Sequence, residues 1–229
     1  PAAATAAPAP AAAAPDTGQP AAARASWLRA SAAWQDAGVR AVLLAALLPE
    51  AALVAGSTTL PLYVHALGWS AARLGSFHSA WGLGGALLGL GPLAWLLRPG
   101  RLSDRTATLT GDLCLAWATL CLAAFPSEAT VWLVLAPFIP AVALLRTCPA
   151  SLLSKAAPAE LRGEALALLD AASSVARIGM PILSGALAER HGVAAPFWLQ
   201  AAMCVAGVAL LTAVDPRAEP ARGERAKRD

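Results

Sequence analysis

The chain has 229 residues, of which 58% are hydrophobic and only 14% are charged, and its formal net charge is +3. Because an ordinary globular domain carries about 25% charged residues, this composition excludes a typical water-soluble fold and indicates helices surrounded by lipid. The small positive charge follows from basic loops at one membrane face, so it does not indicate nucleic-acid binding.

Residues 1–23 consist mostly of alanine and proline. This composition has too little apolar variety for a packed core and favours an extended chain. A short amphipathic segment follows and ends at Arg40. The chain begins at Pro1 and lacks the basic start and continuous apolar stretch of a secretory signal, so we expect a part of a longer protein, with residues 1–40 as a cytoplasmic linker.

Six apolar segments follow, each close to the length of about 20 residues that crosses a hydrocarbon core about 30 Å thick. The third segment is short, and the fourth contains Pro137, Pro140 and Pro149. The sequence therefore predicts an all-α membrane protein, in which residues 41–214 form a six-helix transmembrane bundle and residues 215–229 form a basic cytoplasmic tail. The predicted spans are residues 41–65, 77–97, 109–125, 130–153, 164–187 and 196–214.

The basic residues outside these spans fall almost entirely on one side of the predicted bundle. The other side has only Arg73 and Arg190. Because lysine and arginine are retained on the cytoplasmic face, both ends of the bundle are predicted to be cytoplasmic. Trp69, Trp132 and Trp198 fall at the opposite ends of their spans, where an indole ring can lie in the interface. The cytoplasmic basic residues are Arg24, Arg29, Arg40, Arg98, Arg101, Arg105, Lys155, Arg162, Arg217, Arg222, Arg225, Lys227 and Arg228.

The loop after the second span reads Gly100-Arg101-Leu102-Ser103-Asp104-Arg105. It resembles the G-x-L-[AS]-D-R signature of major facilitator transporters, which lies on the cytoplasmic side after the second helix of each six-helix half. The sequence Thr106-Ala107-Thr108 replaces the aromatic residue, glycine and arginine that usually follow. Glycine permits a tight turn, and the adjacent acid and arginine can hold neighbouring helices together. An ordinary charged loop is the alternative.

Two further segments are in register with the same family. Residues 158–166 contain Glu160, Arg162 and Gly163 and resemble the P-x-E-x-R-G-x-A loop before the fifth helix of a transporter half. Residues 179–185 are similar to the G-x-P-x-x-x-G pattern of the family's eleventh helix. The resemblance covers about residues 41–214. It implies helices seven to twelve of a twelve-helix transporter, whose first six-helix half would be the missing partner.

The chain also contains an internal repeat. Residues 185–190 repeat the pattern of residues 100–105 at a spacing of 85 residues. One copy ends the second span and the other ends the fifth span at the opposite face, as two three-helix units with inverted topology require. The predicted fold is therefore a 3+3 inverted repeat, and chance similarity of six residues is the alternative.

Ionisable side chains inside a span are unfavourable and are therefore candidates for proton coupling or substrate binding. Glu50 lies roughly 14 Å inside the first span, where a carboxyl group can load and release a proton. Asp170 and Arg177 are nearly two helical turns apart and share one face of the fifth span. By depth, Arg146 can pair with Asp170, whereas Arg177 can meet Glu50 or an anionic substrate. Structural ion pairs are the alternative.

Four further polar or glycine positions in the spans are expected to have structural roles. Asp112, near the start of the third span, is expected to cap its helix or to pair with the loop that carries Arg101 and Arg105. His78 is expected to be a hydrogen-bonded residue at the interface. Gly85 and Gly89 have the spacing of close helix contacts.

The four cysteines lie inside apolar segments and have no metal-site spacing. We expect them to be small buried residues. Cys114 and Cys121 would share a helix face, which leaves a redox role open.

The resemblance implies that the protein transports a drug or organic ion across a lipid bilayer by alternating access, in exchange for protons and without a cofactor or metal. Trp81 and Trp117 either offer aromatic surface to a cation or face lipid. A non-transporting scaffold or receptor that keeps the fold is one alternative. An intramembrane enzyme is another, but the G-x-S-G motif of rhomboid proteases is absent and His191 lies outside the predicted spans.

Overall fold

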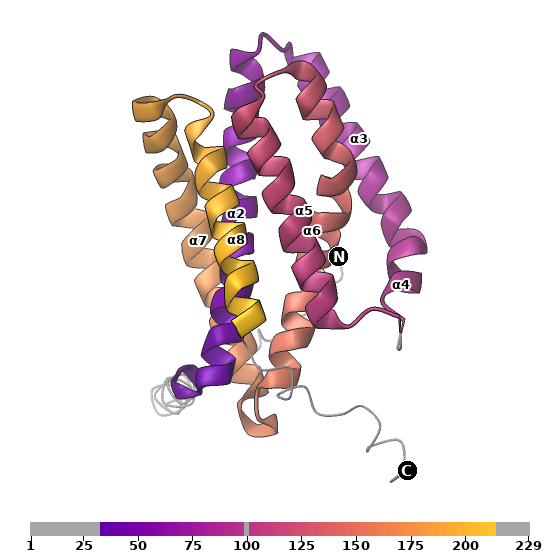
Figure 1. Ribbon diagram of the computed structural model, residues 1–229, viewed down its shortest axis with the longest axis vertical. Coiled ribbons are helices and arrows are strands. Elements are labelled where there is room, and N and C mark those ends of the chain that lie inside the picture. Colours follow the sequence, from indigo (N-terminus) through magenta and orange to yellow (C-terminus); the bar gives the residue numbers. More distant parts are fainter. Residues whose placement is uncertain (1–32, 99–100, 214–229) are drawn as a thin grey trace, which may run out of the picture.

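The computed structural model describes residues 33–98 and 101–213. Within these ranges every regular element is a helix, and the helices form one bundle (Figure 1). Gly100, most of the predicted linker and the predicted tail lie outside the described residues. The elements are α2 (Ala37–Ala66), α3 (Ala71–Leu90), α4 (Pro92–Leu96), α5 (Asp104–Ala124), α6 (Glu128–Ala156), the 3-10 turn η1 (Ala159–Leu161), α7 (Arg162–His191) and α8 (Ala195–Ala213).

The helices extend beyond the apolar segments because polar caps start them. Ser70, Ser103 and Ser127 precede α3, α5 and α6, and each side chain accepts a hydrogen bond from a backbone N–H in the first turn. Such caps satisfy N–H groups that lack a helical partner. As a result α5 starts at Asp104, five residues before the predicted third span, and the residues that follow lie deeper in the helix than predicted.

The second predicted span, residues 77–97, requires the largest correction. Its helix starts at Ala71 and is interrupted at Gly91, after which α4 forms a separate short helix. Five helices in the described part of the chain are long and apolar enough to cross a membrane, and α3 is not among them. The glycines, serines, histidine and arginine of α3 lower its hydropathy. It nevertheless lies beside the other helices and completes the bundle (Figure 1).

The helix packing repeats itself between the two halves of the chain. Helix α2 packs on α8 as α6 packs on α5, and α7 packs on α2 as α3 packs on α6. The contact of α5 with α8 and that of α2 with α6 each join a helix to its own counterpart, whereas the contacts of α7 with α6 and α8 have no equivalent among the main contacts of α3. In Figure 1, α3 and α7 accordingly lie at opposite edges of the bundle. This is the pattern expected of a 3+3 repeat, with α2, α3 and α5 matching α6, α7 and α8.

Burial separates the central helices from the two edge helices. Phe77 is the buried residue of α3, and the most apolar part of α7 is only 11% buried. Large apolar side chains on these helices, such as Leu87, Ile178 and Ile182, are exposed. In water such surfaces would be a liability, so they indicate contact with lipid or with another helical unit.

The close approach of α3 to α6 occurs at a different glycine from the predicted pair. A Cβ atom added to Gly84 would lie 2.5 Å from Ile139 Cδ1, whereas Gly85 and Gly89 have nothing within 4 Å of that position. The prediction for Gly85 and Gly89 is therefore wrong for the described residues. Sequence spacing identifies a small-residue stripe but does not say which side of it meets a neighbour.

The prediction that all four cysteines are buried is only partly correct. Cys148 and Cys204 are buried, whereas Cys114 and Cys121 are half-buried, and all four thiols are free.

Candidate functional site

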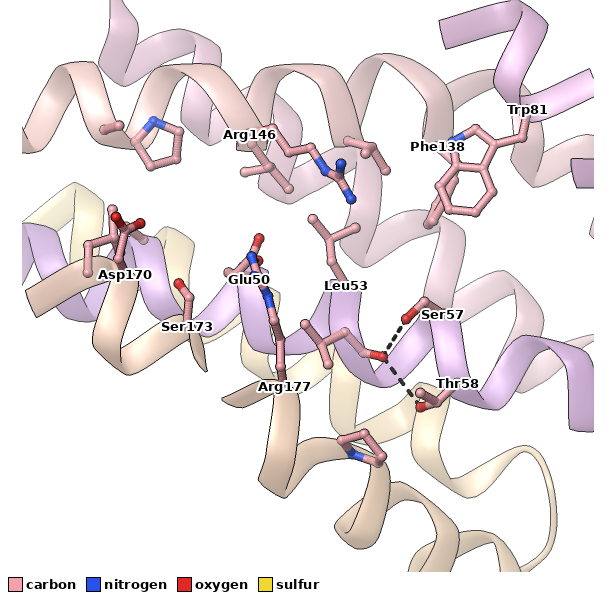
Figure 2. A pocket seen from close by; sticks show the side chains of 18 residues that line it. Glu50, Leu53, Ser57, Thr58, Trp81, Phe138, Arg146, Asp170, Ser173 and Arg177 are labelled. Atoms are coloured by element: carbon pink, nitrogen blue, oxygen red, sulfur yellow. Dashed lines mark hydrogen bonds and ion pairs between the residues drawn. The ribbon is translucent and has the colours of Figure 1, made fainter. Parts of the chain in front are cut away.

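A cavity of about 760 Å³ is lined by residues of α2, α3, α6 and α7. Its size falls within the range of about 300–1,000 Å³ that is typical of small-molecule sites. The four ionisable residues that the sequence predicts as candidates line this one cavity, together with apolar and aromatic side chains (Figure 2). These four are Glu50, Arg146, Asp170 and Arg177.

Glu50 and Arg177 form an ion pair between α2 and α7. Arg177 Nη2 donates to Glu50 Oε1 over 3.3 Å, and the side chains are 22% exposed at Glu50 and 65% exposed at Arg177. This contact is one of the two that the sequence predicts for Arg177. It is a single and fairly long contact, and it joins two helices, α2 and α7, that also pack on each other through apolar side chains.

Arg146 and Asp170 do not form the predicted pair. Neither side chain has an ion pair within the described ranges, and both are exposed. Depth along the membrane normal places two residues at one level, but the rotation of each helix decides whether they face each other. Both residues line the cavity, which therefore holds a cation and an anion that no described side chain neutralises directly.

Aromatic rings lie at the other end of the cavity. Trp81 from α3 and Phe138 from α6 meet edge to face, with ring centroids 5.2 Å apart, and Figure 2 shows them at the end away from Asp170. His78 stacks on Trp81 at 5.9 Å. Trp117 lies on α5, is 46% exposed and is not among the cavity residues. The cavity thus has one charged end and one aromatic end.

Prolines weaken the three helices that carry the charged residues. Pro149 and Pro181 line the cavity in α6 and α7, and Pro49 directly precedes Glu50 in α2. Proline lacks the N–H group that would continue the helical hydrogen bonds. The hydroxyls of Ser57 and Thr58 both donate to the carbonyl oxygen of Val54 in α2 (Figure 2), a contact that also tends to bend a helix.

The loop motif joins three helix ends. Asp104 accepts a hydrogen bond of 2.6 Å from Ser151 and forms an ion pair with Lys155, both in α6. Arg105 Nη2 donates to the carbonyl oxygens of Leu211 (3.0 Å) and Thr212 (3.2 Å) at the end of α8. An arginine placed there satisfies carbonyl groups that the helix leaves without donors. The contacts fix the start of α5 against α6 and α8.

The second predicted motif lies outside the cavity. Glu160 is exposed in η1, and Arg162 begins α7. The Cβ position of Gly163 is open. These residues form the connection from α6 to α7, close in the chain to Lys155.

The structure contradicts the expectation for Asp112. This residue lies two turns inside α5, its side chain is 0% exposed, and neither of its oxygens has a partner in the described structure. It therefore neither caps α5 nor pairs with the loop arginines. The helix cap at Ser103 was the signal in the sequence that would have placed it deeper.

A bundle of apolar helices with charged residues gathered around one cavity defines a multi-pass integral membrane protein. The family model of the Major Facilitator Superfamily matches residues 100–229. This match covers more than half of the chain, so the chain belongs to the Major Facilitator Superfamily, whose members transport small molecules across lipid bilayers. No curated protein matches the chain.

Proposed function

We propose that the chain is the C-terminal half of a transporter that moves a drug or organic ion by alternating access and exchanges it for protons. The observation that carries this proposal is the 760 Å³ cavity in which Glu50, Arg146, Asp170 and Arg177 gather. A substrate with both a charged group and an aromatic or apolar body would use the charged end and the Trp81 end together.

The ion pair between Glu50 and Arg177 supplies a means of proton exchange. Protonation of Glu50 removes its charge and releases Arg177, and loss of the proton restores the pair. A cationic substrate group would compete with the proton for Glu50, whereas an anionic group would bind the released Arg177. In either case substrate and proton act on the same pair of residues, which is the requirement for coupled binding.

A second helical unit is expected to complete the cavity. The exposed apolar faces of α3 and α7 flank it, and α7 carries Arg177 with its side chain 65% exposed. In a transporter of this kind the substrate lies at the interface of two repeats. An N-terminal six-helix half would cover these faces and would reduce the exposure of Arg177.

Asp104 and Arg105 are proposed to hold the cytoplasmic end of the bundle closed. Their contacts with α6 and α8 lie at the end where most basic residues occur, which favours a cytoplasmic location for both ends of the bundle. Tags inserted after Ala213 and in the connection between α2 and α3, residues 67–70, are expected to be accessible from opposite sides of the membrane. Accessibility from the same side would contradict this orientation.

Transport is tested with the full-length protein in lipid vesicles under an imposed pH gradient, with a lipophilic fluorescent cation and an aromatic organic anion as probes. Glu50→Gln should abolish the dependence of flux on the pH gradient. Glu128→Gln is the matched control, because Glu128 is also a paired carboxylate, but neither it nor its partner Arg73 lines the cavity. Unchanged pH dependence in Glu50→Gln would refute the coupling role.

The retained alternative is a scaffold or receptor that does not transport. It is supported by the residues that follow the loop motif, because Thr106 and Thr108 hydrogen bond within the first turns of α5 instead of reaching another helix. Absence of flux for every probe, with specific binding of a probe preserved, would favour this alternative.

A further inference from the structure

Asp112 is a buried acid outside the cavity described above. Its side chain is 0% exposed, and neither Oδ1 nor Oδ2 has a hydrogen-bond partner among the described residues. An ionised carboxylate in such a position is strongly disfavoured unless a cation or several donors stabilise it. The carboxyl group of Asp112 therefore requires a species that neutralises its charge.

The groups nearest to the acid are acceptors or apolar atoms. A Cβ atom added to Gly207 of α8 would lie 3.5 Å from Asp112 Oδ2, 3.4 Å from the carbonyl oxygen of Ala45 and 3.4 Å from Pro49 Cδ. Because Gly207 has no side chain, a small space remains there, and it is bordered by Asp112 Oδ2 and by the carbonyl oxygen of Ala45. Because Pro49 has no N–H, the Ala45 carbonyl four residues earlier lacks its usual helical donor.

None of the helices packed around Asp112 presents a cation to it in the described contacts. Helix α8 contributes Gly207 and, in the same helix, the buried thiol of Cys204, which carries no positive charge. Helix α2 contributes Ala45 and Pro49, and α6 contributes leucine side chains beside Gly111. A proton is the species that neutralises the acid and also gives the Ala45 carbonyl a donor.

We propose that Asp112 is a proton-binding site separate from Glu50, and that its O–H group donates to the carbonyl oxygen of Ala45, directly or through one water molecule. The bond ties α5 to α2 one turn before Pro49, beside Gly207 of α8. Loss of the proton would leave a bare charge between three packed helices and would loosen their contact. Asp112 does not line the cavity, so this site stands independently of the transport mechanism proposed for Glu50.

The test is infrared spectroscopy of the full-length protein in lipid membranes, in the region where the C=O group of a carboxylic acid absorbs. At neutral pH the wild-type protein and Glu50→Gln should both show an acid band that Asp112→Asn lacks. Asparagine is neutral and close in shape to the protonated acid, so this variant is expected to fold. Identical acid bands in wild type and Asp112→Asn would overturn the proposal.

A second comparison tests the acceptor and does not need a variant at Asp112. Pro49→Ala restores an N–H donor to Ala45, so the acid would lose its acceptor and its C=O band should shift to higher frequency. Pro61→Ala removes another proline from the same helix and should leave the band in place. Equal behaviour of the two proline variants would overturn the assigned hydrogen bond. Neither infrared comparison measures transport. A failure of the proton coupling proposed for Glu50 would therefore be distinguished from a failure of the proposal for Asp112.

Discussion

Tyr63 donates a hydrogen bond of 2.7 Å to the carbonyl oxygen of Leu122, and this bond joins the last turn of α2 to the last turn of α5. The carbonyl groups in the last turn of a helix have no donor within the helix. The ring of Tyr63 is buried and meets Phe197 of α8 edge to face at 5.0 Å. One side chain thus connects three helices at the end opposite the Asp104 contacts.

Tyr63→Phe should lower the free energy of unfolding by about 1 kcal/mol, because it removes the donor and leaves the Leu122 carbonyl buried without one. The ring contact with Phe197 is retained in this variant. Tyr63→Leu should cost about 0.5–1.5 kcal/mol more, because it also removes the aromatic pair. Chemical unfolding of the full-length protein in detergent measures both values, and a Tyr63→Phe variant as stable as wild type would count against the bond.

Arg177→Gln should weaken binding of an anionic probe, whereas Glu50→Gln should strengthen it, and the double variant should bind the probe about as weakly as Arg177→Gln alone. The reason is that loss of the Glu50 charge releases Arg177 for the probe, and this gain requires Arg177 to be present. Binding of the probe to purified full-length protein at fixed pH gives the three values. Strict additivity would show that the two residues act on the substrate separately. Arg73→Gln serves as the control for loss of an arginine remote from the cavity.

Arg105→Ala should destabilise the bundle by about 1–3 kcal/mol, because two carbonyl groups at the end of α8 lose a charged donor. Arg101→Ala is the matched control: its guanidinium lies over the Trp95 ring at 3.6 Å, away from α8. Thermal unfolding of the full-length protein should therefore separate the two variants. Equal losses of stability would indicate that only the positive charge of the loop matters.

Gly84→Val should disrupt the packing of α3 on α6, whereas Gly85→Val should be tolerated in the isolated bundle. A Cβ at position 84 would overlap Ile139, while position 85 is open. Ile139 Cδ1 is the far end of a flexible side chain and can turn away from a Cβ atom, but the two γ-methyl groups of valine need further space, and such overpacking typically costs about 1–3 kcal/mol. Cysteine cross-linking between α3 and α6 reports the separation, and a tolerated Gly84→Val would mean that Ile139 can simply move aside. A defect of Gly85→Val confined to the full-length protein would indicate contact with the proposed N-terminal half.

The sequence predicts the order of the helices and the four ionisable residues of the cavity, but not the other residues that line it or how each helix is rotated. Apolar length is enough to find α2, α5, α6, α7 and α8, because burial in lipid requires it. Depth is enough to bring Glu50 and Arg177 to one level, and these two residues do meet. Arg146 and Asp170 satisfy the same criterion and remain apart. Asp112 was misplaced because hydropathy does not detect the polar turn that begins α5 at Asp104.

The low hydropathy of helix α3 affects how the protein is inserted into the membrane during synthesis. Among the described long helices, α3 is the one whose hydropathy is too low for a membrane span. Apart from the adjacent α4, its main partner is α6. Helix α6 is synthesised after α3. A segment of low hydropathy partitions weakly into the bilayer on its own. We therefore expect α3 to integrate stably only after α6 has left the ribosome, so that membrane insertion of this segment depends on residues more than fifty positions downstream.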